Sequence, residues 1–588
     1  MTKTGAEDIT WDLTDLYASP EAAILALNEL RPTVQSFRDA YYGRIEGMVS
    51  VELVNMLITY EDIVDQMGRL YTYAFLWWST QTTEPTAGKF LQQVREGCTA
   101  LHNQLIFVDL SLTTAPEENA MAWMNDPALE KWSHYITLRR SERAYLRSEL
   151  EEQLLAEKQM TGVQAWTRYF DELMARLEVE LDGERLSEQE ALARLHDVDR
   201  DTRRKAARAF TRSLQAEMPS LVFIFNTVLA DKASEDRLRN NESWISARNR
   251  GNEVSDGAVV ALVDSVTGRY DLVQRYYRLK AKVLSIDDFA DFDRYAPMPR
   301  SDRSWSWREA QNLVTESYAA FHPDLGAIVD QFFNRRWIDA RLVAGKRGGA
   351  FSHGAVPSAH PYILMNFTGQ TRDVQTLAHE LGHGVHQYLG RKQGPLLADT
   401  PLTTAETASV FGEMLTFQAL RKTIQAEDEL LPLLLSKIDD SIATVFRQVA
   451  MNRFEDRIHT HRREKGELEA RDFNNHWIAT QRDMFGDACH ISEDYSYWWS
   501  YIPHFLHTPG YVYAYAFGEL LVLSLYAKYQ TMGSSFANLY MELLEAGGSN
   551  YPHELLKPFG IDLNESAFWQ EGLTGIEQMI EEAEQLAG

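Results

Sequence analysis

The chain has 588 residues, of which 45% are hydrophobic and 11% aromatic, which is enough for a substantial core and unlike a disordered chain. Its formal net charge of −27 disfavours partnership with nucleic acid or an anionic membrane surface, because both would repel it. Only Cys98 and Cys489 are present, which excludes a disulfide framework and a cysteine-rich zinc finger. The first residues lack the apolar region of a secretory signal, and no run of about 18 apolar residues exists. We therefore expect a cytoplasmic protein with no nucleic-acid or membrane partner.

The first third of the chain has helical periodicity that ends in a hairpin signal. Ser19-Pro20-Glu21 has the residue types of a helix start, and periodic segments follow at 51–78 and 87–112. After an acidic, leucine-rich stretch, residues 177–181 alternate, Asp182-Gly183 form a turn, and residues 184–186 return. Ser187 and Glu190 then form a capping box. We place a domain boundary here, which gives domains 1–190 and 191–588.

Residues 200–345 are again helical in pattern, and a loop and a strand follow. The loop, residues 345–350, is rich in glycine and basic residues but lacks the Gly-Lys-Ser/Thr ending of a phosphate-binding loop. We interpret it as a flexible loop beside an active site. Residues 361–367 form the clearest strand of the sequence, and we expect it to offer an edge to which an extended peptide can pair.

The segment from Asp373 to Tyr388 contains the pattern H-E-x-x-H as His379, Glu380 and His383. Residues four apart lie on the same face of an α-helix, so the two histidines can bind one metal ion. Thr371 or Asp373 is the expected N-cap, and Gly390 marks the expected end. Apolar residues recur on the other face, at Val374, Leu377, Ala378, Leu381, Val385 and Tyr388.

A hydrolytic zinc site normally has three protein ligands and one open position, so a third ligand is required. A metzincin would place a histidine at position 389, which is a leucine, and His386 fits better as a neighbour of the ligands than as a ligand. The next helical pattern, 403–418, carries Glu406 and Glu413 seven residues apart on one face. We predict Glu406 as the third ligand and Glu413 as the hydrogen-bond partner of a ligand histidine, the alternative being an ordinary solvated helix face. Nitrogen and oxygen ligands in an open site favour Zn²⁺ over Mg²⁺, and we expect one zinc ion per chain.

An aromatic-rich stretch, 501–518, contains His504, His507 and the tyrosines Tyr511, Tyr513 and Tyr515. A tyrosine hydroxyl or a histidine N–H beside a metal can stabilise the oxyanion that forms during peptide hydrolysis. By itself, such a stretch is more often part of a hydrophobic core.

Three segments together resemble the thimet oligopeptidase and oligoendopeptidase F family of zinc metallopeptidases, closest to the oligoendopeptidase F branch. They are residues 379–386 (HELGHGVH), residues 405–413 (AETASVFGE), and residues 502–505 (IPHF) with the run 511–515. The resemblance implies a mainly α-helical, two-lobed clamshell with a deep channel and a small β element next to the H-E-x-x-H helix. An N-terminal helical lobe, 1–190, would face a catalytic lobe, 191–588.

The resemblance also implies a zinc-dependent endopeptidase that hydrolyses short peptides. His379, His383 and Glu406 take the ligand positions, and Glu380 takes that of the general base. His504 and Tyr511 take the positions of transition-state donors, with His507 as a rival to His504. The spacing from His504 to the tyrosine run is one residue longer than the family pattern, which makes Tyr513 and Tyr515 rivals to Tyr511.

Two other functions remain open from the sequence. A zinc carboxypeptidase of similar helical fold would need a cationic anchor for the terminal carboxylate, for which Arg347 is a candidate. A non-catalytic peptide-binding protein is disfavoured, because Glu380 stands beside a complete ligand set.

Overall fold

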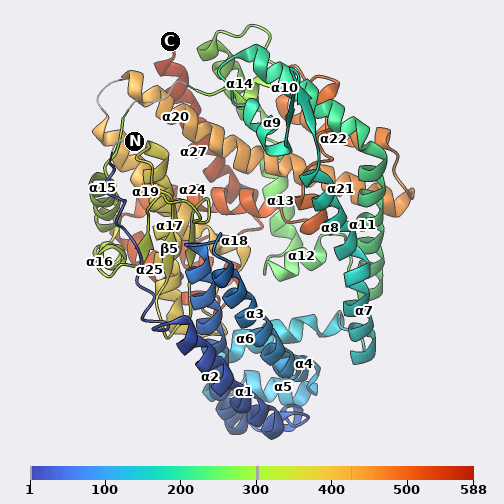
Figure 1. The fold of residues 1–588 in the computed structure, drawn as a ribbon, viewed down its shortest axis with the longest axis vertical. Coiled ribbons are helices and arrows are strands. Elements are labelled where there is room, and N and C mark those ends of the chain that lie inside the picture. The colour runs from blue at the N-terminus through green and yellow to red at the C-terminus, as the bar shows by residue number, and fades with distance from the viewer. Residues whose placement is uncertain (1–2, 299–302, 425–426) are drawn as a thin grey trace. The chain divides into compact units, whose positions relative to one another are not determined.

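The structure is a computed structural model that describes residues 3–298, 303–424 and 427–588. Within these residues the elements are mainly α-helices, α1 to α27, with short 3-10 and π-helical segments and only five strands of two or three residues each. The predicted mainly helical class is therefore confirmed (Figure 1).

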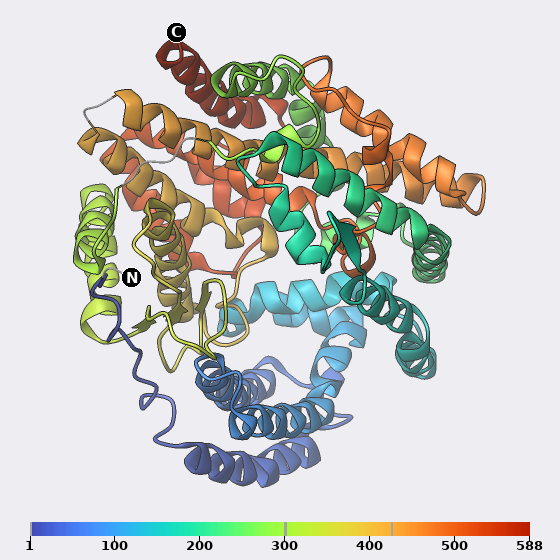
Figure 2. The same cartoon turned by 45° about the horizontal axis from the view of Figure 1, so that its top comes forward.

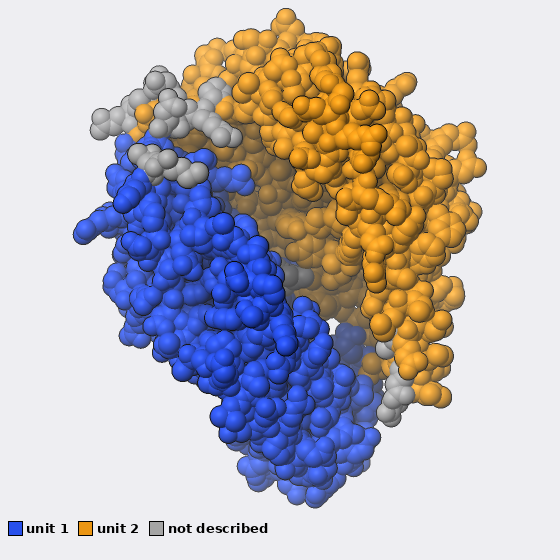
Figure 3. Space-filling view, in the orientation of Figure 1, with its two compact units in different colours: residues 1–143, 302–423, 528–561 blue, residues 144–301, 424–527, 562–588 orange. Residues whose placement is uncertain are grey.

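The chain forms two compact units of three segments each (Figure 3). Unit 1 comprises Met1–Arg143, Asp302–Thr423 and Lys528–Ile561, and unit 2 comprises Ala144–Ser301, Ile424–Ala527 and Asp562–Gly588. These units differ from the two continuous domains 1–190 and 191–588, which stay a prediction, as does the clamshell.

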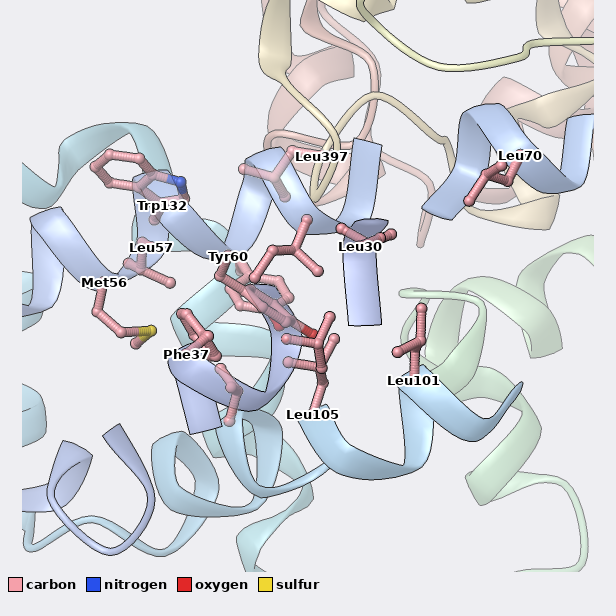
Figure 4. Packing of buried hydrophobic residues seen from close by; sticks show 14 of the residues in the cluster. Leu30, Phe37, Met56, Leu57, Tyr60, Leu70, Leu101, Leu105, Trp132 and Leu397 are labelled. Atoms are coloured by element: carbon pink, nitrogen blue, oxygen red, sulfur yellow. The ribbon is translucent and has the colours of Figure 1, made fainter. Parts of the chain in front are cut away.

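The N-terminal part of unit 1 is a bundle in which α1, α2 and α3 lie side by side (Figures 1 and 2). The predicted start of α1 is confirmed, because Ser19 Oγ accepts a hydrogen bond from the Ala22 N–H. Apolar side chains at helical spacing fill the space between the helices, as Phe37 of α1 and Tyr60 of α2 do with rings 6.0 Å apart (Figure 4). The bundle helices are α1 Pro20–Tyr41, α2 Ser50–Ser79, α3 Pro85–Leu105, α4 Phe107–Thr114, α5 Glu117–Met124 and α6 Ser133–Ser141.

The second part of unit 1 combines helices with a small sheet of strand order β3-β5-β4. The predicted strand is β5, Tyr362–Leu364, which is shorter than expected and completely buried. It pairs in parallel with β3, Ile338–Asp339, and antiparallel with β4, Phe351–His353. The expectation that this strand offers a pairing edge is therefore wrong, because both of its edges are occupied. The helices are α15 Trp307–Phe321, α16 Pro323–Asn334, α17 Thr371–Gly390, α18 Leu402–Ala405, α19 Thr407–Thr423, α25 Ser534–Ala546 and α26 Pro552–Leu556.

Unit 2 has its own core of buried aromatic and aliphatic side chains, and it contains the predicted hairpin. Strands β1, Val179–Leu181, and β2, Glu184–Leu186, pair around Asp182-Gly183, and the Ser187–Glu190 capping box opens α9. The helices are α7 Glu149–Thr161, α8 Val163–Ala175, α9 Glu188–Arg194, α10 Arg200–Ala216, α11 Met218–Arg239, α12 Ser246–Gly251, α13 Asp256–Thr267, α14 Tyr270–Leu284, α20 Glu427–Ser441, α21 Arg447–Glu464, α22 Ala470–Phe485, α23 His504–His507 and α27 Ser566–Leu586; α24, Tyr513–Met532, contributes to both units.

Candidate metal centre and active site

Helix α17 carries the H-E-x-x-H residues, and its apolar face is buried as predicted, with Tyr388 half-buried. The helix begins at Thr371, and its N-cap is Gln370 rather than Thr371 or Asp373. Asp373 instead occupies the first turn, where its carboxylate accepts hydrogen bonds from the N–H groups of Gln370 and Thr368. The end at Gly390 agrees with the prediction.

The side chains of His379, His383 and Glu406 converge on one point. Glu406 Oε2 lies 3.4 Å from His379 Nε2 and 3.3 Å from His383 Nε2, and the three candidate ligand atoms all lie within 4.8 Å of one another. The structure therefore brings together the three residues predicted as ligands. Two imidazole nitrogens and one carboxylate oxygen are a donor set that hydrolytic zinc sites commonly use.

The predicted continuous helix 403–418 is interrupted at the ligand itself. Helix α18 ends at Ala405, Glu406 is its C-cap, and α19 begins at Thr407. Glu406 and Glu413 thus do not share one unbroken helix face, which corrects the prediction. They lie on opposite sides of the His379 ring, because Glu413 Oε2 is 3.5 Å from Nδ1 while Glu406 is near Nε2. Glu413 thus lies beside His379, one of the two histidines predicted as ligands.

Close packing of α17 against α19 makes this arrangement possible, and it depends on Gly382. A Cβ atom at Gly382 would lie 2.3 Å from the Ala408 carbonyl oxygen and 2.5 Å from Ser409 Cα, so no larger residue fits without displacing α19. The contact also places Ser409 so that its hydroxyl donates to Glu406 Oε2 at 2.7 Å. Sequence reasoning missed Ser409, although the glycine inside the motif was a signal of a close approach.

The carboxyl group of Glu380 is buried beside the candidate ligands. Burial raises its pKa, while the neighbouring histidines and a hydrogen bond from the backbone N–H of Ser352 in β4 oppose the rise. Burial would also raise the pKa of Glu406, but the hydrogen bond and charge of His383 and the charge of His379 lower it to about 2. The pKa values of these two neighbouring carboxyl groups are therefore shifted in opposite directions, as two different chemical roles would require.

His386 lies outside the converging group, in agreement with the interpretation that it is no ligand. It is buried, and burial lowers its pKa to about 4, so it is neutral at physiological pH.

The loop 345–350 is less free than expected, because the side chain of Lys346 is buried and its ammonium lies 2.7 Å from Asp339 Oδ1. The same ammonium donates to the Met365 carbonyl, which ties the loop to the end of β5.

The predicted donors belong to unit 2, whereas the candidate ligands belong to unit 1. His504, Tyr511 and Tyr515 form one half-buried group, with His504 Nε2 3.3 Å from the Tyr515 hydroxyl and the two tyrosine rings 5.0 Å apart. Two of the rivals have other partners. Tyr513 is completely buried, and its hydroxyl accepts a hydrogen bond from Asn252 at 2.9 Å, while His507 Nε2 lies 2.8 Å from Asp171.

Residues 193–575 match the profile of peptidase family M3, and residues 112–178 match a profile described as oligopeptidase F. The first match alone covers more than half of the chain.

The chain belongs to peptidase family M3.

The resemblance inferred from the motifs is thus confirmed, and this M3 chain is a peptidase. It is 27% identical to oligopeptidase PepF of Bacillus subtilis over 99% of its own length and 87% of the Bacillus protein. It is also 24% identical to the group B oligopeptidase PepB of Streptococcus agalactiae, over 99% of its length and 97% of that protein.

Solved structures agree with this membership. A Chlamydophila abortus protein, described as a candidate peptidase, has a TM-score of 0.90 and 25% identity over 98% of both chains. The oligoendopeptidase F of Enterococcus faecium has a TM-score of 0.71 and 21% identity over 95% of this chain and 98% of that one, which supports the fold. Within residues 3–298, 303–424 and 427–588, no helix combines the length and apolar composition that crossing a membrane requires.

Proposed function

We propose that this M3 peptidase is a zinc-dependent endopeptidase that hydrolyses short oligopeptides. The observation that carries the proposal is the convergence of His379, His383 and Glu406 beside the buried Glu380. The residues fit zinc, because both imidazoles direct Nε2 at the same carboxylate oxygen and Glu413 lies at the second nitrogen of His379. A bound zinc ion would supply Lewis-acid polarisation of the peptide carbonyl and a water of lowered pKa.

Glu380 is the general base of this proposal. Burial raises the pKa of Glu380 toward the pH at which the enzyme works. A carboxylate with such a pKa is still ionised at that pH and accepts a proton readily. Glu380 accepts a proton from the attacking water and then donates it to the nitrogen of the leaving amine.

His504, Tyr511 and Tyr515 are the proposed donors to the oxyanion, since these three side chains are grouped and half-buried. Tyr513 is a poor candidate because its hydroxyl is already used in the core.

The outer edge of β4 is the proposed pairing edge for the peptide. In the described sheet, β4 has a neighbouring strand on one side only, and a backbone hydrogen bond of its residue Ser352 lowers the pKa of Glu380. A peptide that pairs along this edge therefore passes the general base. In a series of test peptides, each with one N-methylated amide, cleavage should be abolished only when the methyl group is at one or two particular amides. Cleavage of every N-methylated peptide would contradict pairing.

A zinc carboxypeptidase is the alternative, with Arg347 as its anchor. The guanidinium of Arg347 lies over the rings of Phe75 and Phe351, 5.4 Å and 5.3 Å from their centroids. Mass spectrometry of products from one peptide with a free or an amidated C-terminus separates the two activities. An endopeptidase cuts internal bonds in both peptides, and release of single C-terminal residues from the free peptide alone would favour the carboxypeptidase.

The proposed partners are short peptides, and the proposed location is the cytoplasm. Both cysteines are free thiols, which suits a reducing compartment.

A further inference from the structure

A buried tyrosine of α15, Tyr318, lies between the two helices that carry candidate ligands and their neighbours. Its hydroxyl donates to the Ala378 carbonyl of α17 at 2.7 Å. It also faces Gly412 of α19, where a Cβ atom would overlap the hydroxyl and lie 3.2 Å from the same carbonyl oxygen. The carbonyl group of Ala378 shares a planar peptide unit with the N–H of His379. The hydrogen bond therefore restrains the backbone at a candidate ligand.

A second buried tyrosine, Tyr540 of α25, makes a similar contact at the other segment that supplies a candidate ligand. Its hydroxyl donates to the Thr407 carbonyl at 3.0 Å, and Thr407 is the first residue of α19, directly after Glu406. The first N–H groups of a helix lack partners within the helix, so the backbone is less firmly fixed there than in the middle of a helix. A donor from another helix therefore restrains the backbone next to Glu406, where α18 has ended and α19 begins.

The rings of both tyrosines are held by packing, so their hydroxyl groups have defined positions. Tyr318 is 2% exposed and Tyr540 1%. Tyr540 stacks on Phe411 of α19 with ring centroids 4.5 Å apart, and it meets Phe321 of α15 edge-on at 5.5 Å. Phe321 also contacts Phe411, at 4.9 Å, and lies one turn after Tyr318 on α15. One aromatic cluster thus joins α15, α19 and α25 around the two hydroxyl groups.

We propose that Tyr318 and Tyr540 are positioning residues of the candidate metal centre. Tyr318 holds α17 at His379, and Tyr540 holds α19 at Glu406, so these two ligands keep their separation before a metal ion binds. Ligands that are already in place bind a metal ion more tightly, because binding does not have to order them. This inference rests on the zinc site of the proposed function, and it gives both hydroxyl groups a task beyond packing.

The test removes each hydroxyl group and measures zinc affinity without any peptidase assay. Tyr318→Phe and Tyr540→Phe keep the rings, and the zinc dissociation constant, measured by competition with a chromophoric chelator, should rise by about 10–100-fold in each. Tyr276→Phe is the matched control, because Tyr276 is buried in unit 2 and its hydroxyl donates to the Leu435 carbonyl at 3.1 Å. This control should bind zinc as tightly as the wild type does.

Thermal unfolding separates positioning from a general effect on stability. Without zinc, all three variants should melt about 1–3 °C below the wild type, since each has lost one buried hydrogen bond. At one fixed zinc concentration, the rise in melting temperature should be smaller than in the wild type for Tyr318→Phe and Tyr540→Phe, and unchanged for Tyr276→Phe. Should one of the two positioning variants fail to fold, the other gives the same comparison, since each tyrosine holds a different ligand.

The possible failures can be told apart. Equal zinc affinities in the wild type and both positioning variants, or the same loss of affinity in Tyr276→Phe, would overturn the positioning role and leave the proposed function intact. A wild-type protein that binds no zinc would contradict the proposed function and the positioning role together.

Discussion

At the scale of single residues, the environments of Glu380 and Glu406 differ in the way that the two roles proposed for these carboxyl groups require. Glu380 is shielded from solvent, which favours its neutral form, and Glu406 is held by two histidines, which favours its ionised form. A ligand must stay ionised, while a base must accept and release a proton. The sequence alone places both residues but does not reveal this difference, because it arises from burial.

The tyrosines of the 511–515 run should differ in their effects. Tyr511→Phe or Tyr515→Phe should lower kcat by about 10²–10³ with KM little changed, because an oxyanion donor acts mainly in the transition state. Tyr513→Phe is the matched control and should remain close to wild type in kcat, since its hydroxyl contacts Asn252. Steady-state kinetics of the three variants checks this. Normal kcat for both Tyr511→Phe and Tyr515→Phe would indicate that these tyrosines contribute only to packing.

Glu455 gives a prediction for pH. Burial raises its pKa to about 8, and only one of its oxygens is bonded, to the Gly510 N–H at 2.8 Å. A carboxyl group whose pKa rises on folding stabilises the fold at low pH, and this contribution is lost as pH rises from about 4.5 through about 8. Melting temperatures from pH 5 to 9 should therefore fall less steeply for Glu455→Gln than for wild type. The exposed Glu464→Gln, on the same helix, should match wild type; identical slopes for all three proteins would contradict the assignment.

At the scale of elements, the contact between α17 and α19 assembles the candidate metal centre. Gly382→Ala should destabilise the fold by about 1–3 kcal/mol, because its Cβ would overlap the backbone at Ala408 and Ser409. The displaced α19 should also weaken zinc binding, since Glu406 and Glu413 move with it. Gly88→Ala, in α3 with open space around the position, is the control and should be neutral or stabilising. Chemical denaturation and zinc titration measure both effects, and unchanged zinc affinity in Gly382→Ala would refute the role of this contact.

The elements also show what local sequence determines. Helix α17 was predicted closely because its apolar periodicity, its histidine spacing and Gly390 are all local signals. The break at Glu406 carries no such signal, because a helix cap without glycine or proline resembles a continuous helix. The sheet order could not be predicted either, since the partners of β5 are only two or three residues long and come from separate segments. Ser352 and Ser409 reach the site only through tertiary packing.

At the scale of the whole molecule, we expect a ceiling on substrate size. The deep channel implied by the family resemblance would admit an extended peptide but not a folded protein. Peptides of roughly 5–20 residues should be cleaved, because an extended chain spans about 3.3 Å per residue and must fit one domain-sized groove. A peptide ladder incubated beside native and denatured casein measures the ceiling. Rapid degradation of a compact folded protein would contradict a channel.

The measurement that tests the central claim most directly is zinc content combined with single-turnover cleavage of an amidated peptide, for wild type and Glu380→Gln. The account predicts one zinc ion per chain in both proteins, cleavage by the wild type that chelator removes and zinc restores, and a loss of several orders of magnitude in rate for Glu380→Gln. Glu406→Ala should instead lose the metal. An active wild-type enzyme without a transition metal, or a Glu380→Gln variant that cleaves at nearly the wild-type rate, would contradict the account.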